Sequence, residues 1–192
     1  MGKKVRLIVF IAALAALSIV TNVFTVVLYG NNSLSFTYLT SFIAGIFLGP
    51  IGGVAVGLIG DGLGHLIAPK GAFNPYIFVS AGLIGLIPGL VFKFFRFVKS
   101  DFIKLLISYV LCFLICTAFL NTYGLWLLYS NGRTFWVYFL VRVPLQLIMI
   151  IANFAATFFI MHVDAIKKFF LFMHTNEPKN KKNTDNKVAE SE

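Results

Sequence analysis

Three polar side chains stand inside long apolar runs of the sequence: Asp61 supplies an acid, Asn121 an amide and Arg142 a cation. An ionisable residue within a membrane-length apolar segment is costly, so it usually faces a cavity or a partner. Carboxylates and amides accept hydrogen bonds, and the planar donor fork of arginine can hold a carboxylate in two parallel hydrogen bonds. Residues of these types predict a binding cavity.

Residues 48–75 surround Asp61 with small residues and end in a turn. His65 follows Asp61 by one helical turn, on the same face. The apolar run then breaks at residues 68–71, a charged turn of sequence APKG. Glycine recurs at spacings that let neighbouring helices approach closely, at Gly49, Gly52, Gly53, Gly57, Gly60, Gly62 and Gly64. This stretch favours a binding cavity over a plain membrane anchor.

The composition is that of an integral membrane protein. The 192 residues are 59% hydrophobic and 12% charged, whereas a soluble domain is about 45–50% apolar and about 25% charged. At ~20 residues for each crossing, the length allows about six spans. The net charge of +9 comes from basic residues that flank apolar segments, so it is not a sign of nucleic-acid binding.

We predict an all-α bundle of six transmembrane helices over residues 1–165. A polar cytoplasmic tail, residues 166–192, follows the bundle, and we expect it to be disordered. Residues 29–35 form a polar loop and residues 49–53 a tight turn. The expected spans are residues 5–28, 36–48, 51–67, 76–97, 103–128 and 135–161.

Basic residues give the orientation, because cytoplasmic loops carry an excess of Lys and Arg. With the N-terminus inside, the outer side holds only Lys70 and Arg133. The inner side holds the other basic residues that flank the spans, Lys3, Lys4, Arg6, Lys93, Arg96, Lys99, Lys104, Lys167 and Lys168. We therefore place both termini in the cytoplasm.

This orientation puts Asp61, Asn121 and Arg142 at one depth. At ~1.5 Å per residue, all three lie roughly 9–11 Å below the outer surface. Polar groups from three helices at one depth predict a cavity that opens to the outside. An ion pair between Asp61 and Arg142 that holds the bundle together is the alternative, and the two are compatible.

Two short patterns leave structural and functional alternatives open. Ala12 and Ala16 form a small-xxx-small pair on one face of the first span. This face either packs against a helix of the same chain or docks another membrane protein. Cys112 and Cys116 are four residues apart in an apolar run, which is typical of two packed thiols.

Motifs for catalysis, metals and nucleotides are absent from the sequence. There is no Walker A motif, so the chain cannot power transport by itself. There is no HExxH or paired-cysteine zinc motif, and His65, His162 and His174 are scattered. No nucleophile stands near a base in a recognisable pattern. We therefore expect no enzymatic activity, no metal and no other cofactor.

The run LGPIGGVAVGLIGDGLGHLIAPKGAFNP, residues 48–75, resembles the signature of the substrate-binding S components of energy-coupling factor (ECF) transporters. Three further segments agree with it, and the resemblance covers residues 5–165. Residues 80–89 (SAGLIGLIPG) resemble the helix that follows in that family. Residues 120–127 (LNTYGLWL) and 141–146 (VRVPLQ) resemble the folate-specific members, although Gln146 stands where lysine is common.

The resemblance implies a six-helix protein of the bacterial plasma membrane that captures a vitamin at the outer face. It also implies three partners, which are a transmembrane scaffold subunit and two cytoplasmic ATPases, and release of the vitamin by toppling of the S component in the lipid. Ala12 and Ala16 match the Ala-x-x-x-Ala pattern through which the first helix of the family contacts the scaffold. Residues 29–35 and 68–75 match its lid loops, and the second of these contains Pro69, Lys70 and Gly71.

Folate is the ligand that the resemblance favours. Folate carries a flat pterin ring with donors and acceptors, a benzoyl ring and a glutamate with two carboxylates. We expect Asp61 and Asn121 to bond the ring and Arg142 to bind a carboxylate. The aromatic side chains that we expect to stack on the ligand are Phe73, Tyr76 and Trp126.

Two other functions compete with folate uptake. The first is an S component for another vitamin or small nutrient, which the departure at Gln146 favours. The second is a structural or assembly protein of the membrane without a transport role, and the intramembrane Asp61 and Arg142 count against it.

Overall fold

The computed structural model describes residues 3–27, 33–34, 36–95, 97–98, 100–130, 132 and 134–163. Over these residues the protein is an all-α membrane bundle, with one short antiparallel ladder between two strands of two residues each. Five helical runs in this part of the chain are long and apolar enough to cross a membrane. The predicted tail, residues 166–192, lies outside the described residues, as does most of the predicted loop 29–35.

The elements follow the predicted order along the chain. Their bounds are α1 (Lys3–Val23), β1 (Val26–Val27), β2 (Ser33–Leu34), α2 (Thr37–Ile67), α3 (Pro75–Phe94), α4 (Asp101–Cys112), the π-helix η2 (Phe113–Asn121), α5 (Thr122–Tyr129) and α6 (Phe135–His162). The runs α4, η2 and α5 are continuous and together form one span, Asp101–Tyr129.

Gly49 divides α2 into two helical parts. Its backbone has φ 83° and ψ 178°, a positive-φ conformation that glycine adopts without steric cost. Pro50 follows and is accommodated at the start of the second part, where its missing N–H would be unpaired in any case. The break stands where the sequence predicts a turn, but the turn is shorter than the predicted 49–53 because the helix resumes at Pro50.

Glycine brings the backbones of α2 and α3 into direct contact. A Cβ added at Gly53 would overlap the carbonyl oxygen of Gly85, and one at Gly85 would overlap that of Gly53. A Cβ at Gly57 would likewise overlap the carbonyl oxygen of Ala81. Small residues permit such close approach where lipid offers little drive for helix association. The predicted role of glycine in close helix packing is confirmed for this pair of helices.

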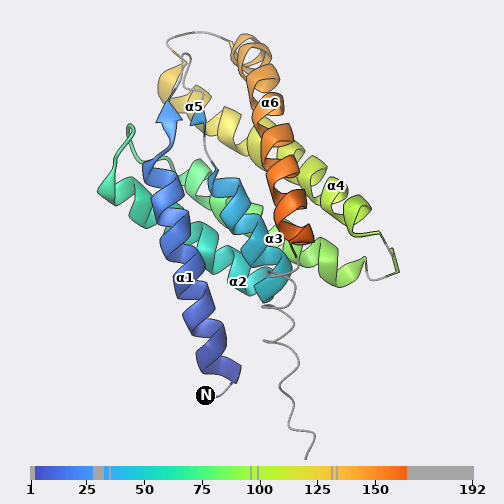
Figure 1. The fold of residues 1–192 in the computed structure, drawn as a ribbon. Helices are drawn as coiled ribbons and strands as arrows, with labels where there is room; N and C mark the ends of the chain where they lie inside the picture. The colour runs from blue at the N-terminus through green and yellow to red at the C-terminus, as the bar shows by residue number, and fades with distance from the viewer. Residues whose placement is uncertain are drawn as a thin grey trace, which may run out of the picture.

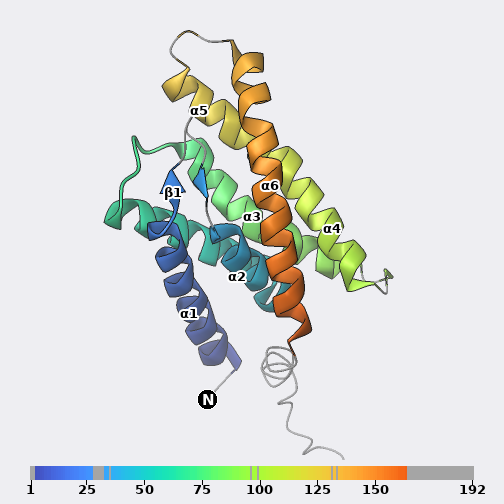
Figure 2. The ribbon, with the colours of Figure 1, turned by 45° about the horizontal axis from the view of Figure 1, so that its top comes forward.

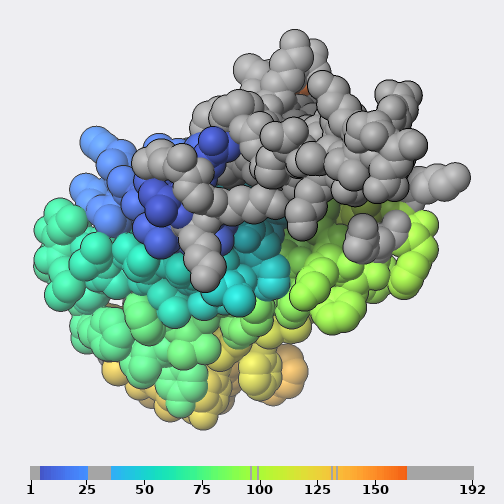
Figure 3. All heavy atoms as spheres, turned by 90° about the horizontal axis from the view of Figure 1, so that it is seen from below, coloured from blue at the N-terminus to red at the C-terminus, as the bar shows by residue number. Residues whose placement is uncertain are grey.

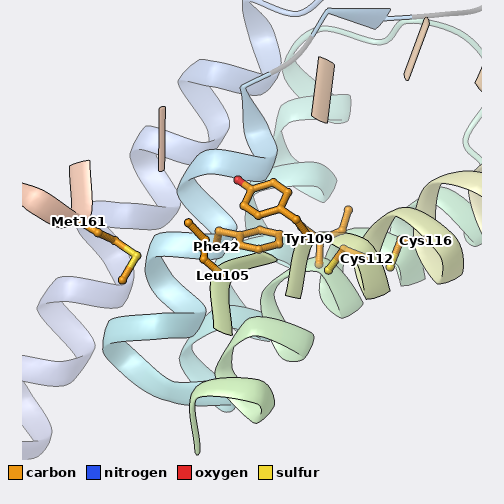
Figure 4. Packing of buried hydrophobic residues seen from close by; sticks show 7 residues of the cluster. Phe42, Leu105, Tyr109, Cys112, Cys116 and Met161 are labelled. Atoms are coloured by element: carbon orange, nitrogen blue, oxygen red, sulfur yellow. The ribbon is translucent and has the colours of Figure 1, made fainter. Parts of the chain in front are cut away.

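The core joins α2 to α4, η2 and α6. The rings of Phe42 and Tyr109 stack with centroids 3.9 Å apart (Figure 4). Cys112 and Cys116 are fully buried free thiols in the same cluster, as the sequence predicts. The Tyr109 hydroxyl lies 2.7 Å from Thr157 Oγ1, and four of the five buried residues of α6 are polar or charged, Arg142, Gln146, Asn153 and Thr157.

The figures show how the helices are arranged. Helix α1 lies on one side of the bundle, and α4 and α6 lie on the other (Figures 1 and 2). Figure 3 views the lower end of Figure 1, where the first described residues of α1, the middle of α2 and the adjoining ends of α3 and α4 come to the surface. The loop between α2 and α3 lies away from this end, beside the C-terminal end of α1 (Figure 1).

Candidate functional site

A cavity of about 310 Å³ lies between the helices and the loop of residues 68–74. This volume falls within the usual range of about 300–1,000 Å³ for small-molecule sites. Asp61, Asn121 and Arg142, which come from α2, η2 and α6, all line this one cavity. Its other polar lining residues are Asn22, Thr25, Thr37, Tyr38, Ser41, His65, Lys70, Asn74, Ser80 and Tyr129.

Asp61 accepts a hydrogen bond from α1. In the part of the chain that the structure describes, it forms no ion pair with Arg142. Asn22 Nδ2 donates to Asp61 Oδ1 at 3.1 Å. The ammonium of Lys70 donates to the carbonyl oxygen of Asn22 and, at 3.3 Å, to Asn22 Oδ1. Partial burial lowers the pKa of Lys70 and nearby Asp61 partly opposes this shift. Asp61, Asn22 and Lys70 therefore form one polar corner of the cavity, with His65 beside them.

Arg142 belongs to a different wall of the cavity. It is only 5% exposed, and Tyr38 and Tyr138 lie near its guanidinium. The Tyr38 hydroxyl lies 2.5 Å from Thr117 Oγ1, which joins the start of α2 to η2. The cation and the acid of the cavity thus have different neighbours, and a bound molecule can meet each of them separately.

The π-helix sets the direction of Asn121. A π-helix has i→i+5 hydrogen bonding and is rare, often occurring at functional sites. Here it extends over nine residues, and Thr122 Oγ1 donates to Thr117 O at 2.8 Å. Within the described residues, Asn121 Oδ1 and Ser80 Oγ are buried without a hydrogen-bond partner. Both residues line the cavity, so both offer hydrogen-bonding capacity beside a bound molecule.

The predicted stacking residues occupy two different places. Phe73 lines the cavity, and its ring centroid is 5.8 Å from that of His65. Tyr76 and Trp126 are not among the lining residues. Both belong to an aromatic cluster that joins α3, α5 and α6. In this cluster the ring centroid of Tyr123 lies 5.5 Å from that of Tyr76 and 5.9 Å from that of Trp126.

The loop of residues 68–74 crosses the cavity between α1 and α5. Lys70 and Gly71 line the cavity, whereas Pro69 is exposed and does not. The backbone N–H of Ala72 donates to the Tyr129 hydroxyl at 3.0 Å. Asn74 ends the loop as the N-cap of α3, where its Oδ1 accepts from Tyr76 N at 3.0 Å.

Ala12 and Ala16 lie on the exposed face of α1. The opposite face of α1 carries Ala15 and Ser18, which are buried against α2. In the described residues, packing within the chain therefore uses Ala15 in place of the two predicted alanines. The exposed pair leaves a smooth strip of small residues on the outside of the bundle.

Asn22, Tyr38 and Tyr129 line the cavity but are absent from the sequence-based set. Each is uncharged and stands near the end of a predicted span, where polar residues are common. The depth argument does not reach Tyr129, because Tyr129 directly follows the predicted span 103–128 and so lies at the surface end of that span. No sequence signal shows that Asn22 approaches Asp61, since that contact joins residues 39 apart.

Comparison with known proteins gives concordant similarities. The sequence model of the family described as ECF transporter, substrate-specific component, matches residues 6–161. The folate transporter FolT of Clostridium novyi (strain NT) is 28% identical over 147 residues, which are 77% of this chain and 83% of that protein. A crystal structure of FolT bound with folic acid matches with a TM-score of 0.68 and 20% identity, over 85% of this chain and 95% of the other.

Proposed function

The chain belongs to the family of substrate-specific components of ECF transporters, and from this membership we propose that it captures folate at the outer face of the membrane for uptake. It is a multi-pass protein of the bacterial plasma membrane, with several helices of membrane length. The family consists of transport subunits and not of enzymes, and it works with a scaffold subunit and ATPases.

The observation that carries this proposal is that Asp61, Asn121, Arg142 and Phe73 line a single cavity. Arg142 would hold a glutamate carboxylate, and a bidentate guanidinium bond is specific for such a group. Asn121 and Ser80 would bond the pterin ring, with Phe73 against its face. Asp61 would bond the ligand from the polar corner that it forms with Asn22 and Lys70. Tyr76 and Trp126 would support the wall through their aromatic cluster.

The experiment that tests the ligand is equilibrium binding of tritiated folate to the purified protein. Saturable binding at one site per chain is expected, and Arg142→Met is expected to weaken it. An excess of unlabelled folate should displace the label, whereas unrelated vitamins should not. Absence of saturable folate binding by well-folded protein would overturn the folate assignment.

Another small nutrient is the second candidate, because Gln146 is buried one helical turn after Arg142. Gln146 does not line the cavity, so a neutral amide at this position would affect the ligand only through neighbouring residues. Displacement of bound folate by a different vitamin at lower concentration would favour this candidate.

We also propose six crossings with both termini in the cytoplasm. The break at Gly49 supports this count, because it divides α2 into two helical parts and the 31 residues of α2 exceed the ~20 that one crossing needs. The basic residues at the ends of the spans support the orientation. Under this topology the loop of residues 68–74 faces outward, residues 1–165 form the membrane domain and residues 166–192 form the tail. This topology can be tested by placing a single cysteine in each loop of the protein and measuring its labelling in intact cells by a reagent that does not cross the membrane.

Docking to the scaffold is proposed to use Ala12 and Ala16. Their exposure on α1 supports this role, since small side chains let a partner helix approach closely. The outward-facing loop with Pro69, Lys70 and Gly71 is proposed to act as the lid of the cavity.

A further inference from the structure

The loop of residues 68–74 is attached at both sides of the cavity. On one side Lys70 reaches α1 through two oxygens of Asn22. On the other side the N–H of Ala72 reaches the hydroxyl of Tyr129 at the end of α5. These contacts lie between the ends of the loop, so they decide where the loop lies and not only where it begins.

Asn22 serves both the loop and the cavity wall. Its amide nitrogen donates to Asp61, while its amide oxygen and its backbone oxygen accept from Lys70. The backbone oxygen belongs to the last turn of α1, which spans Lys3–Val23, and the C-terminal end of a helix favours a cation. Because one residue makes all three contacts, a displacement of Asn22 breaks them together.

The place of Asn22 is set by how α1 lies on α2. Ser18 and Asn22, one turn apart, pack on Gly60 and Gly64. A Cβ at Gly60 would overlap the Ser18 side chain, and a Cβ at Gly64 would lie 2.7 Å from Asn22 Cγ. At these two contacts α1 and α2 are closely packed, so a movement of α1 away from α2 carries Asn22 with it.

We propose that Asn22 is a positioning residue that fastens the loop of residues 68–74 to α1. The position of α1 against α2 then determines whether the loop covers the cavity. Release of Asn22 frees Lys70 from the end of α1, and between its ends the loop then keeps only weaker contacts that involve no cation, which are the bond to Tyr129 and the ring contacts of Phe73 among the described residues. The proposal deepens the proposed function, because the covered cavity is the proposed ligand site.

The experiment measures access to the covered cavity without any ligand. Ser41 lines the cavity and is buried, so Ser41→Cys provides a site that a water-soluble maleimide reaches only when the loop is displaced, and the native Cys112 and Cys116 are fully buried. Asn22→Leu and Lys70→Met are each introduced into this background. Each is expected to raise the alkylation rate about tenfold, the change expected when a charge-assisted hydrogen bond worth ~1.4 kcal/mol is lost. The double variant should be no faster than either single one, since both remove the same contact.

A second pair of variants tests the role of α1 without changing any residue of the fastening. Gly60→Ala pushes on Ser18 and should lift α1, so it is expected to raise the alkylation rate as well. Gly82→Ala is the matched control, because its Cβ would meet Leu58 of α2, 3.0 Å away, and not α1. It should leave the rate at the wild-type value. Circular dichroism and size-exclusion profiles confirm that each variant is folded.

The outcomes separate this proposal from the ligand assignment. An unchanged alkylation rate in folded Asn22→Leu, or equal rates for Gly60→Ala and Gly82→Ala, would overturn the fastening. If Asn22 only contacts the ligand, its replacement changes folate affinity but not alkylation of the ligand-free protein, and the proposal fails. The alkylation assay uses no folate, so its result does not depend on whether folate is the ligand.

Discussion

Arg142 lies on a wall of the cavity with little of its surface exposed, and its position on α6 is among other buried polar residues. Asp61, the acid at the same predicted depth, bonds Asn22 of α1 instead. At the scale of single residues, the cavity therefore presents its cation and its acid to a ligand from separate places.

Removal of the Arg142 cation should weaken ligand binding without unfolding the protein. Arg142→Met keeps most of the side-chain volume and removes the guanidinium that is proposed to bind a carboxylate of the ligand. Loss of a charge-assisted bond worth ~1.5–3 kcal/mol corresponds to roughly 10- to 100-fold weaker folate binding. Arg142→Lys should be intermediate, because a single ammonium cannot reproduce the bidentate geometry. Folate titrations measure the loss, and wild-type affinity in folded Arg142→Met would contradict it.

Asp61 and Arg142 should contribute independently to the stability of the empty protein. The structure shows Asp61 bonded to Asn22, whereas Tyr38 and Tyr138 lie near Arg142, so the contacts described for the two residues do not overlap. In a double-mutant cycle of Asp61→Asn and Arg142→Met, the changes in unfolding free energy should add within about 0.5 kcal/mol. Melting curves of the four proteins measure this sum. A partial rescue of stability in the double variant would instead indicate a direct pair.

The sequence predicted the charged residues of the cavity better than its neutral ones. Asp61 and Arg142 are conspicuous because lipid does not tolerate charge, and both line the cavity. Asn22 and Tyr129 carry no such cost at the ends of spans, so their part in the site follows only from the folded structure. Trp126 illustrates the opposite case, since an aromatic ring near the membrane surface packs equally well on other rings.

Helices and their order were predictable because apolar runs of membrane length must form them. Their internal irregularities were predictable only in part. The break in α2 is predictable because Gly49 is followed directly by a proline. The π-helix of Phe113–Asn121 has no comparable signal, because a shift from i→i+4 to i→i+5 bonding depends on tertiary contacts such as that of Thr117 with Tyr38.

Shortening the π-helix should remove Asn121 from the cavity. Phe119 is 67% exposed, so its deletion costs little packing, but it lets the remaining residues return to α-helical bonding. Asn121 then turns by about 100° relative to the residues before Phe119. Folate affinity is expected to fall at least as far as in Asn121→Ala, with helical content unchanged. Insertion of one alanine beside the deletion should restore binding, and failure to do so would argue against this role.

A bulky residue on the exposed face of α1 should block transport but not capture. Ala12→Trp or Ala16→Trp places a large ring where the scaffold helix is proposed to approach. Ile148→Trp provides the control, since Ile148 is 65% exposed on α6. Folate binding by the purified protein should be normal in all three, and uptake by cells should be lost only in the two α1 variants. Normal uptake with Ala12→Trp and Ala16→Trp would exclude this docking face.

At the scale of the whole molecule, the bundle contains two kinds of interface. Helices α2 and α3 meet through backbone contacts at glycine, which allow little relative movement. Helix α1 presents alanines outward and Asn22 inward, so a scaffold docked on the proposed outer face would act on the helix that fastens the loop. The two proposals together predict that scaffold docking and the state of the loop are linked through one helix.

Docking of the scaffold should therefore open the cavity in the wild-type background but not further in Asn22→Leu. In the complex reconstituted with scaffold and ATPases, Ser41→Cys should be alkylated faster than in the isolated protein. In the Asn22→Leu background, the fastening is already absent and docking should add nothing. Alkylation rates of the four preparations give the comparison. An equal acceleration in both backgrounds would mean that docking reaches the loop by another route.

The π-helix also has a consequence for the evolution of this family. Gain or loss of one residue within residues 113–121 would turn the residues that follow by about 100° relative to those before, while moving them by only ~1.5 Å along the span. A new ligand preference can thus arise by a single-codon deletion or duplication, without any substitution of a lining residue. An alignment that forbids gaps within transmembrane segments would pair Asn121 with a lipid-facing residue of an all-α relative. Comparison of ligand-contacting positions among relatives accordingly needs structures, or gaps placed inside this helix.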